Sequence, residues 1–226
     1  MSKILLAAVQ MASSPNVHAN LIEARRLIEM ATTDGASFVV LPENFAFMGM
    51  AEADKLAIAE EYGAGPIQDF LAKTAERSKV WLVGGTLPIK ASNGKVRSAC
   101  LVFNHQGQRV GRYDKIHLFD VNVPGTEERY QESNTIDAGD EPVVLDTPFG
   151  RLGLSICYDL RFRNCIDRWP TRDWICWSYH PLLPRKPALL TGRFYCELVP
   201  WKIFVTPSPP IKADFTSMGE RLLGIV

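Results

Sequence analysis

The sequence predicts an α/β layered domain built around a mixed β-sheet, and three observations lead to this prediction. Short apolar runs recur along the chain, amphipathic helical patterns alternate with them at first, and later runs come in pairs joined by turn residues. Strands separated by helices favour parallel neighbours, whereas strands joined by tight turns are antiparallel. A chain of 226 residues suits one domain of ordinary size.

The first part of the chain alternates strand and helix. Residues 4–9 are apolar at consecutive positions, which indicates a strand covered on both faces. In residues 20–31 apolar side chains recur at helical spacing between charged ones, and Asp34-Gly35 ends this helix. Further elements of the same kinds are predicted as strands at residues 38–41 and 80–83 and a helix at residues 67–78.

The later elements are predicted as strand pairs. Residues 96–103 and 108–113 flank the turn residues 104–107, and residues 143–146 and 152–156 flank Pro148-Phe149-Gly150. The sequence shows no internal repeat and no low-complexity linker.

Composition narrows the class of protein. The hydrophobic fraction of 46% and charged fraction of 22% are typical of a soluble globular chain, and the formal net charge is zero. We therefore expect no nucleic-acid partner and no membrane partner. The apolar run at residues 4–9 is too short for a signal peptide, and five cysteines without a CxxC pair favour the reducing cytoplasm.

Three chemically capable residues lie where predicted strands end. Glu43 follows residues 38–41, Lys115 follows residues 108–113, and Cys157 follows residues 152–156. Strand ends that feed loops are where α/β folds usually carry their chemistry. Taken singly, each has a simpler explanation as a helix cap, a surface lysine or a small core residue.

Together the three could hydrolyse an amide. Cys157 would attack the carbonyl carbon, and Glu43 would take the thiol proton and pass it to the leaving amine. Lys115 would stabilise the oxyanion, helped by the backbone N–H that follows the nucleophile.

The residues around this trio carry a resemblance to a known family. The motifs are Ala-Ala-Val-Gln-Met (7–11), Leu-Pro-Glu-Asn-Phe (41–45), Tyr-Asp-Lys-Ile-His-Leu-Phe-Asp-Val (113–121), Tyr-Gln-Glu-Ser (130–133) and Ser-Ile-Cys-Tyr-Asp-Leu-Arg-Phe (155–162). In this order they resemble the nitrilase superfamily of carbon–nitrogen hydrolases. The resemblance covers residues 3–162.

The resemblance implies a fold, a site and a reaction. The implied fold is an αββα sandwich, and the implied roles are Glu43 as general base, Lys115 as oxyanion stabiliser and Cys157 as nucleophile. Glu132 would position the substrate and the lysine, and the Tyr158 N–H would complete the oxyanion hole. The route is a thioester with release of ammonia, without metal or cofactor, and an intact chain would form a homodimer.

Two branches of the superfamily fit the local sequence. Residues 43–49 resemble the branch that hydrolyses deaminated glutathione, and residues 121–125 also suit the omega-amidase branch. Both branches act on amides of small carboxylates, so the sequence leaves the substrate open between them.

A cysteine–histidine pair is the competing prediction for the site. His117 or His105 would then be the base for Cys157, and strand-like alternation through Ile116 would place His117 on the same side as Lys115. We favour a structural hydrogen-bonding role for His117. Exchanging Glu43 for Gln separates the two ideas, because activity would survive if a histidine were the base.

The chain departs from the family after Phe162. The family would continue with Pro-Glu and a helix, whereas Arg163-Asn164-Cys165 stands here. Four of the five tryptophans and eight of the fifteen prolines lie beyond Phe162. Domain boundaries at 1–162 and 163–226 follow from this change, and the αββα sandwich is predicted to be incomplete after residue 162.

A reading-frame shift would explain the departure. If one base is restored before Arg163, the following codons can read P-E-L-Y-R-S-M, and residues 191–203 can read W-Q-V-L-L-R-A-R-A-V-E-N. We predict that residues 163–226 are a frameshifted remainder of the same domain, with open strand edges and poor solubility or low activity. The alternatives are a genuinely divergent tail, a catalytically inactive product or a binding protein with a repurposed tail.

Overall fold

The computed structural model describes two stretches of chain in full, residues 5–122 and 129–162. It also describes the backbone of four later strands: β11 (Ile175–Tyr179), β12 (Trp201–Val205), β13 (Asp214–Met218) and β14 (Arg221–Ile225). The rest of the predicted aberrant tail lies outside the described residues.

The larger sheet is mixed, as predicted. Its order is β13-β14-β1-β2-β3-β5-β4, with β6 also paired to β5. β1, β2 and β3 are parallel to one another, and the other pairs are antiparallel. The strands from the first part are β1 (Leu5–Val9), β2 (Phe38–Val40), β3 (Trp81–Val83), β4 (Leu87–Lys90), β5 (Val96–Phe103) and β6 (Arg109–Asp114).

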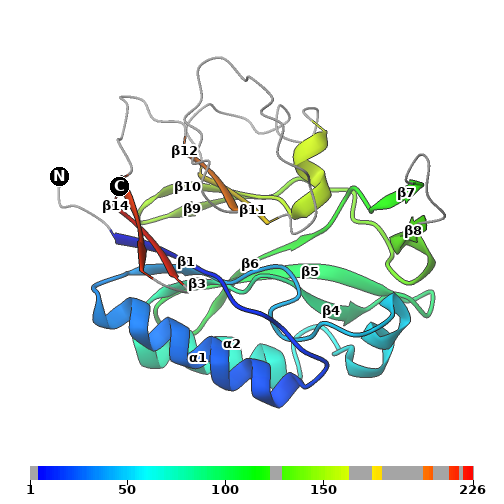
Figure 1. Ribbon diagram of the computed structural model, residues 1–226, viewed down its shortest axis with the longest axis horizontal. Coiled ribbons are helices and arrows are strands. Elements are labelled where there is room, and N and C mark those ends of the chain that lie inside the picture. The colour runs from blue at the N-terminus through cyan, green and yellow to red at the C-terminus, as the bar shows by residue number, and fades with distance from the viewer. Residues whose placement is uncertain are drawn as a thin grey trace.

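Two helices, α1 (Val17–Thr33) and α2 (Pro66–Ser78), cover one face of this sheet (Figure 1). The Asn16 side chain accepts a hydrogen bond from the Ala19 N–H and so starts α1 before the apolar pattern begins. Pro66 starts α2, where a missing N–H costs nothing. The predicted helices are therefore confirmed, each beginning slightly earlier than its apolar stripe.

A second sheet packs on the opposite face, with the order β12-β11-β10-β9 (Figure 1). β9 (Val144–Thr147) and β10 (Gly150–Leu154) form the predicted hairpin. Alternate residues of β1 explain its unbroken apolar run, because Ala7 and Val9 join the helix-side core while Leu6 and Ala8 join the core between the sheets. The described residues thus supply one helix layer and two sheet layers.

The backbone of the later strands corrects one expectation. Open edges were predicted for the strands of the first part, but β14 pairs with β1 and β11 pairs with β10. Strand pairing uses backbone N–H and C=O groups, which every residue except proline supplies whatever its side chain. Pairing of this kind therefore leaves the prediction of a frameshift untested.

Several short elements of the fold escape the sequence patterns. They are the 3₁₀ helices η1 (Glu52–Ile58), η2 (Glu132–Asn134) and η3 (Cys157–Arg161), the ribbon of β7 (Asp120–Asn122) with β8 (Arg129–Gln131), and β4. Elements of three to seven residues are too short for a period to emerge. Among the described helices, none has the length and apolar character that crossing a bilayer requires.

Candidate active site

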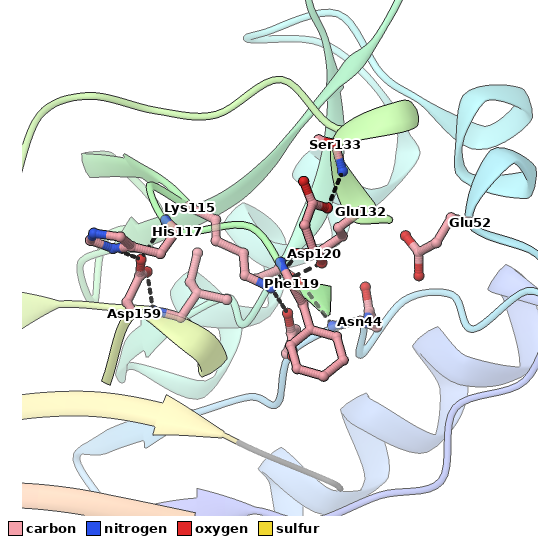
Figure 2. A network of polar contacts seen from close by, with 12 residues as sticks. Asn44, Glu52, Lys115, His117, Phe119, Asp120, Glu132, Ser133 and Asp159 are labelled. Carbon is pink, nitrogen blue, oxygen red and sulfur yellow. Dashed lines mark hydrogen bonds and ion pairs between the residues drawn. The ribbon is translucent and has the colours of Figure 1, made fainter. Parts of the chain in front are cut away.

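The structure brings the predicted site residues together between the two sheets. The Nζ of Lys115 lies 3.1 Å from Oε1 of Glu43 and 2.9 Å from the carboxylate oxygens of Glu132. Lys115 is 1% exposed, and Figure 2 shows its side chain reaching toward Glu132. A buried ammonium held between two carboxylates is a fixed positive charge rather than a surface lysine.

Glu132 also fixes the loop that follows Lys115. Its Oε2 accepts a hydrogen bond of 2.7 Å from the Phe119 N–H, in addition to its contact with the lysine. The predicted positioning of Lys115 by Glu132 thus has a direct geometrical basis.

Cys157 occupies a strained backbone position after β10. Its φ is +49°, in the left-handed region that residues other than glycine rarely adopt. The residue is 8% exposed. Residues held in such conformations gather at functional sites, because the surrounding structure must enforce them.

Burial is the main cause that raises the pKa of the Cys157 thiol. The negative charges of Glu43 and Glu132 act in the same direction, and the Lys115 ammonium opposes them without cancelling them. The resting nucleophile is therefore a protonated thiol, which needs a base to become reactive. Glu43 makes a side-chain hydrogen bond with this thiol and is placed to accept its proton.

The pKa of Lys115 is raised despite its burial. Desolvation favours the neutral amine, but Glu43 and Glu132 together outweigh it. Lys115 therefore stays an ammonium and can stabilise negative charge on a reacting oxygen.

Asp159 is a central residue of the site that the sequence reasoning missed. It is fully buried, and its carboxylate accepts hydrogen bonds from the Tyr113 hydroxyl at 2.7 Å and the Ile156 N–H at 2.9 Å. It also accepts from the His117 N–H at 2.8 Å. Asp159 thus ties the turn that bears Cys157 to the segment that bears Lys115. The sequence feature that could have identified Asp159 is its position two residues after the nucleophile.

His117 has the structural role that we favour. Its Nδ1 lies 2.8 Å from Asp159 Oδ1, and its ring stacks on Phe162 with centroids 3.9 Å apart. The chain bends at His117, so the alternation that would place it beside Lys115 is wrong, and Figure 2 shows it turned toward Asp159. His105 is exposed in the β5–β6 turn, at the end of the hairpin opposite Lys115.

Tyr158 contributes both backbone and side chain. Its N–H lies in the first turn of η3, where no intrahelical acceptor exists. Its ring packs edge-on against Phe119 and Phe162, with centroids 5.1 and 5.3 Å apart. The N–H is the group predicted for the oxyanion hole.

Within the described residues, no group of histidine, cysteine and carboxylate side chains could hold a metal ion.

Comparison with known proteins identifies the family of the chain. The family model described as carbon-nitrogen hydrolase matches residues 5–166. A deaminated glutathione amidase of Synechocystis is 45% identical over 166 residues, which are 72% of this chain and 60% of that protein. Omega-amidase NIT2-B of Xenopus laevis is 39% identical over 230 residues, which are 97% of this chain and 80% of that protein. The chain thus spans about 60% of the length of the first of these relatives.

Solved structures share the fold. Saccharomyces cerevisiae Nit3, from branch 10 of the nitrilase superfamily, superposes with a TM-score of 0.66 at 29% identity over 78% of this chain and 65% of that one. The NitFhit protein of C. elegans superposes with a TM-score of 0.65 at 32% identity over 73% of this chain and 40% of that one. The predicted nitrilase-like fold is confirmed, and the chain belongs to the carbon–nitrogen hydrolase family of the nitrilase superfamily.

Proposed function

We propose that this chain is an amidase that hydrolyses the carbon–nitrogen bond of a small carboxylate amide through a cysteine thioester. The observation that carries the proposal is the buried cluster in which Lys115 contacts Glu43 and Glu132 while Glu43 contacts the thiol of Cys157. This cluster holds a nucleophile, a base and a fixed cation within reach of one carbonyl group.

Acylation begins when Glu43 takes the Sγ proton as the sulfur attacks the amide carbon. The negative charge that forms on the carbonyl oxygen is stabilised by the Lys115 ammonium and the Tyr158 N–H. Collapse of the tetrahedral intermediate breaks the carbon–nitrogen bond. The departing nitrogen takes the proton from Glu43 and leaves as ammonia, and an acyl group remains on Cys157 as a thioester.

Deacylation repeats these roles with water. Glu43, again a carboxylate, removes a proton from a water molecule that attacks the thioester carbon. Collapse of the second intermediate breaks the carbon–sulfur bond, releases the carboxylic acid and returns the proton to Cys157. The two half-reactions need no redox partner.

A deaminated glutathione-like amide is the substrate that we favour. The support is the 45% identity to a protein named deaminated glutathione amidase and the sequence of residues 43–49. The alternative is an omega-amidase that acts on 2-oxoacid amides, supported by the alignment with omega-amidase NIT2-B over 97% of the chain. Either activity would belong in the cytoplasm and, for an intact chain, in a homodimer.

A second candidate is a catalytically inactive product, whether frameshifted or a binding protein with a repurposed tail. It is favoured by the change in composition after Phe162 and by the end of the family match at residue 166. The nucleotide sequence across the codons of Phe162 and Arg163 tests the frameshift. Codons that are incompatible with the restored reading frame would refute the frameshift.

One experiment separates the two candidates. Ammonia release is measured for the whole chain with deaminated glutathione and with a 2-oxoacid omega-amide, beside Cys157→Ala. The amidase proposal predicts turnover that the variant lacks. Absence of turnover, together with no labelling of Cys157 by a thiol-reactive amide analogue, would support the inactive product.

A further inference from the structure

We propose that Thr86 is a positioning residue for Glu43, because its hydroxyl holds the turn that presents the carboxylate to Cys157 and Lys115. The inference deepens the proposed amidase function and rests on it. It assigns Thr86 no contact with substrate.

The segment that carries Glu43 leaves the sheet in an unusual conformation. The Leu41 N–H still donates to the Val83 carbonyl at 2.9 Å, which continues the pairing of β2 with β3. Asn44 then has a φ of +56°, in the left-handed region. Asparagine adopts that region more readily than most residues besides glycine, so Asn44 suits this turn, and its contacts then fix the turn in place.

Thr86 supplies the holding contact. The Asn44 N–H donates a hydrogen bond of 2.7 Å to Oγ1 of Thr86, and the two residues lie 42 positions apart in the chain. Thr86 is 3% exposed, so water cannot easily replace its hydroxyl as the acceptor. The contact fixes the residue directly after Glu43, and any shift there moves the carboxylate.

The glycine before Thr86 makes this contact possible. Gly85 has a φ of +55°, and a Cβ at this position would collide with the Pro42 carbonyl. The backbone of Gly85 therefore passes directly against the backbone before Glu43, which brings the Thr86 hydroxyl within reach of Asn44. The loop after β3 thus serves as the support for the Glu43 turn.

A positioning role differs from a general stabilising role in one measurable way. The negative charge of Glu43 helps to raise the pKa of Cys157. If loss of the Thr86 hydroxyl lets Glu43 move away, the pKa of Cys157 falls even while the chain stays folded. A residue that only stabilises the fold would leave that pKa unchanged.

The test compares Thr86→Val with Thr86→Ser and a matched control, Thr74→Val. Valine keeps the shape of threonine and removes the hydroxyl, serine restores the hydroxyl, and Thr74 is a buried threonine within α2. Each whole chain is assayed for ammonia release, thermal unfolding and the pH dependence of Cys157 alkylation by iodoacetamide, read by peptide mass spectrometry.

We expect Thr86→Val to lower kcat by about 10- to 100-fold, the scale of a misplacement near 1 Å, with KM nearly unchanged. The apparent pKa of Cys157 alkylation should fall as well. Thr86→Ser and Thr74→Val should keep both values. The inference is overturned if Thr86→Val matches the wild type in kcat and alkylation, or if Thr74→Val changes them equally.

Two provisions keep the test decisive. If Thr86→Val does not fold, Thr86→Ala takes its place with the same expected and contradicting results. If the wild type releases no ammonia, the proposed function fails, but the alkylation measurement needs no substrate and still decides whether Thr86 positions Glu43.

Discussion

Replacing Tyr113 with Phe tests the link between the Cys157 turn and the Lys115 segment. The Tyr113 ring is 1% exposed, and its hydroxyl donates a 2.7 Å hydrogen bond to the fully buried carboxylate of Asp159. The substitution keeps the ring and removes only the hydroxyl group. The hydrogen bonds that Asp159 accepts from the Ile156 and His117 N–H groups remain.

The expected loss follows from the charge of the acceptor. A hydrogen bond to a charged group contributes about 1.5–3 kcal/mol to stability, and burial prevents water from replacing the hydroxyl. For a chain of this length, 1 kcal/mol corresponds to a shift in Tm of roughly 2–4 °C. We therefore expect the variant to lose about 3–12 °C in Tm. A loosened turn should also lower kcat by about 10-fold.

The assay is thermal unfolding and ammonia release, with Tyr62→Phe as the matched control. Tyr62 is half exposed and packs beneath the guanidinium groups of Arg109 and Arg112, contacts that a phenylalanine ring keeps. The control should change stability by no more than about 0.5 kcal/mol. A Tyr113→Phe variant as stable as this control would refute the assigned role of Asp159.

Three further predictions address the chemistry. Glu43→Gln should lower ammonia release by about 10²- to 10⁴-fold and also lower the apparent pKa of Cys157 alkylation, because the carboxylate that helps to raise it is gone. An unshifted alkylation pKa would contradict this. His105→Ala should leave ammonia release unchanged, since this residue is exposed at the far end of its hairpin. A large loss of ammonia release would instead support a cysteine–histidine pair. Because the Cys157 pKa is raised above its ordinary value of 9.0, the folded chain should lose stability as pH rises through that value. Denaturant unfolding should therefore show a larger fall in the free energy of unfolding, from neutral to alkaline pH, for the wild type than for Cys157→Ala. An equal fall in the two proteins would contradict this prediction.

Much of the fold follows from patterns within one element. The continuous apolar run of β1 predicts a strand buried on both faces, and the stripes of α1 and α2 predict the side that they bury. Glu43 and Lys115 follow β2 and β6, which run in the same direction in one sheet with β3 and β5 between them, so both residues leave the sheet at the same edge.

The remainder of the site depends on contacts that no local pattern encodes. The bonds of Asp159 to Tyr113 and His117 join residues more than 40 positions apart, and so does the bond from Asn44 to Thr86. Likewise, the left-handed backbone of Cys157 reflects the structure around it rather than the preference of cysteine. Such features become visible only when the sheets are assembled.

The central claim is that Cys157 forms a thioester with the acyl group of an amide. The direct measurement is rapid acid quenching of the whole chain during turnover of a small carboxylate amide, followed by peptide mass spectrometry. The account predicts an acyl adduct on the peptide that contains Cys157, and none in Cys157→Ala. An adduct on another residue, or ammonia release by Cys157→Ala, would contradict it.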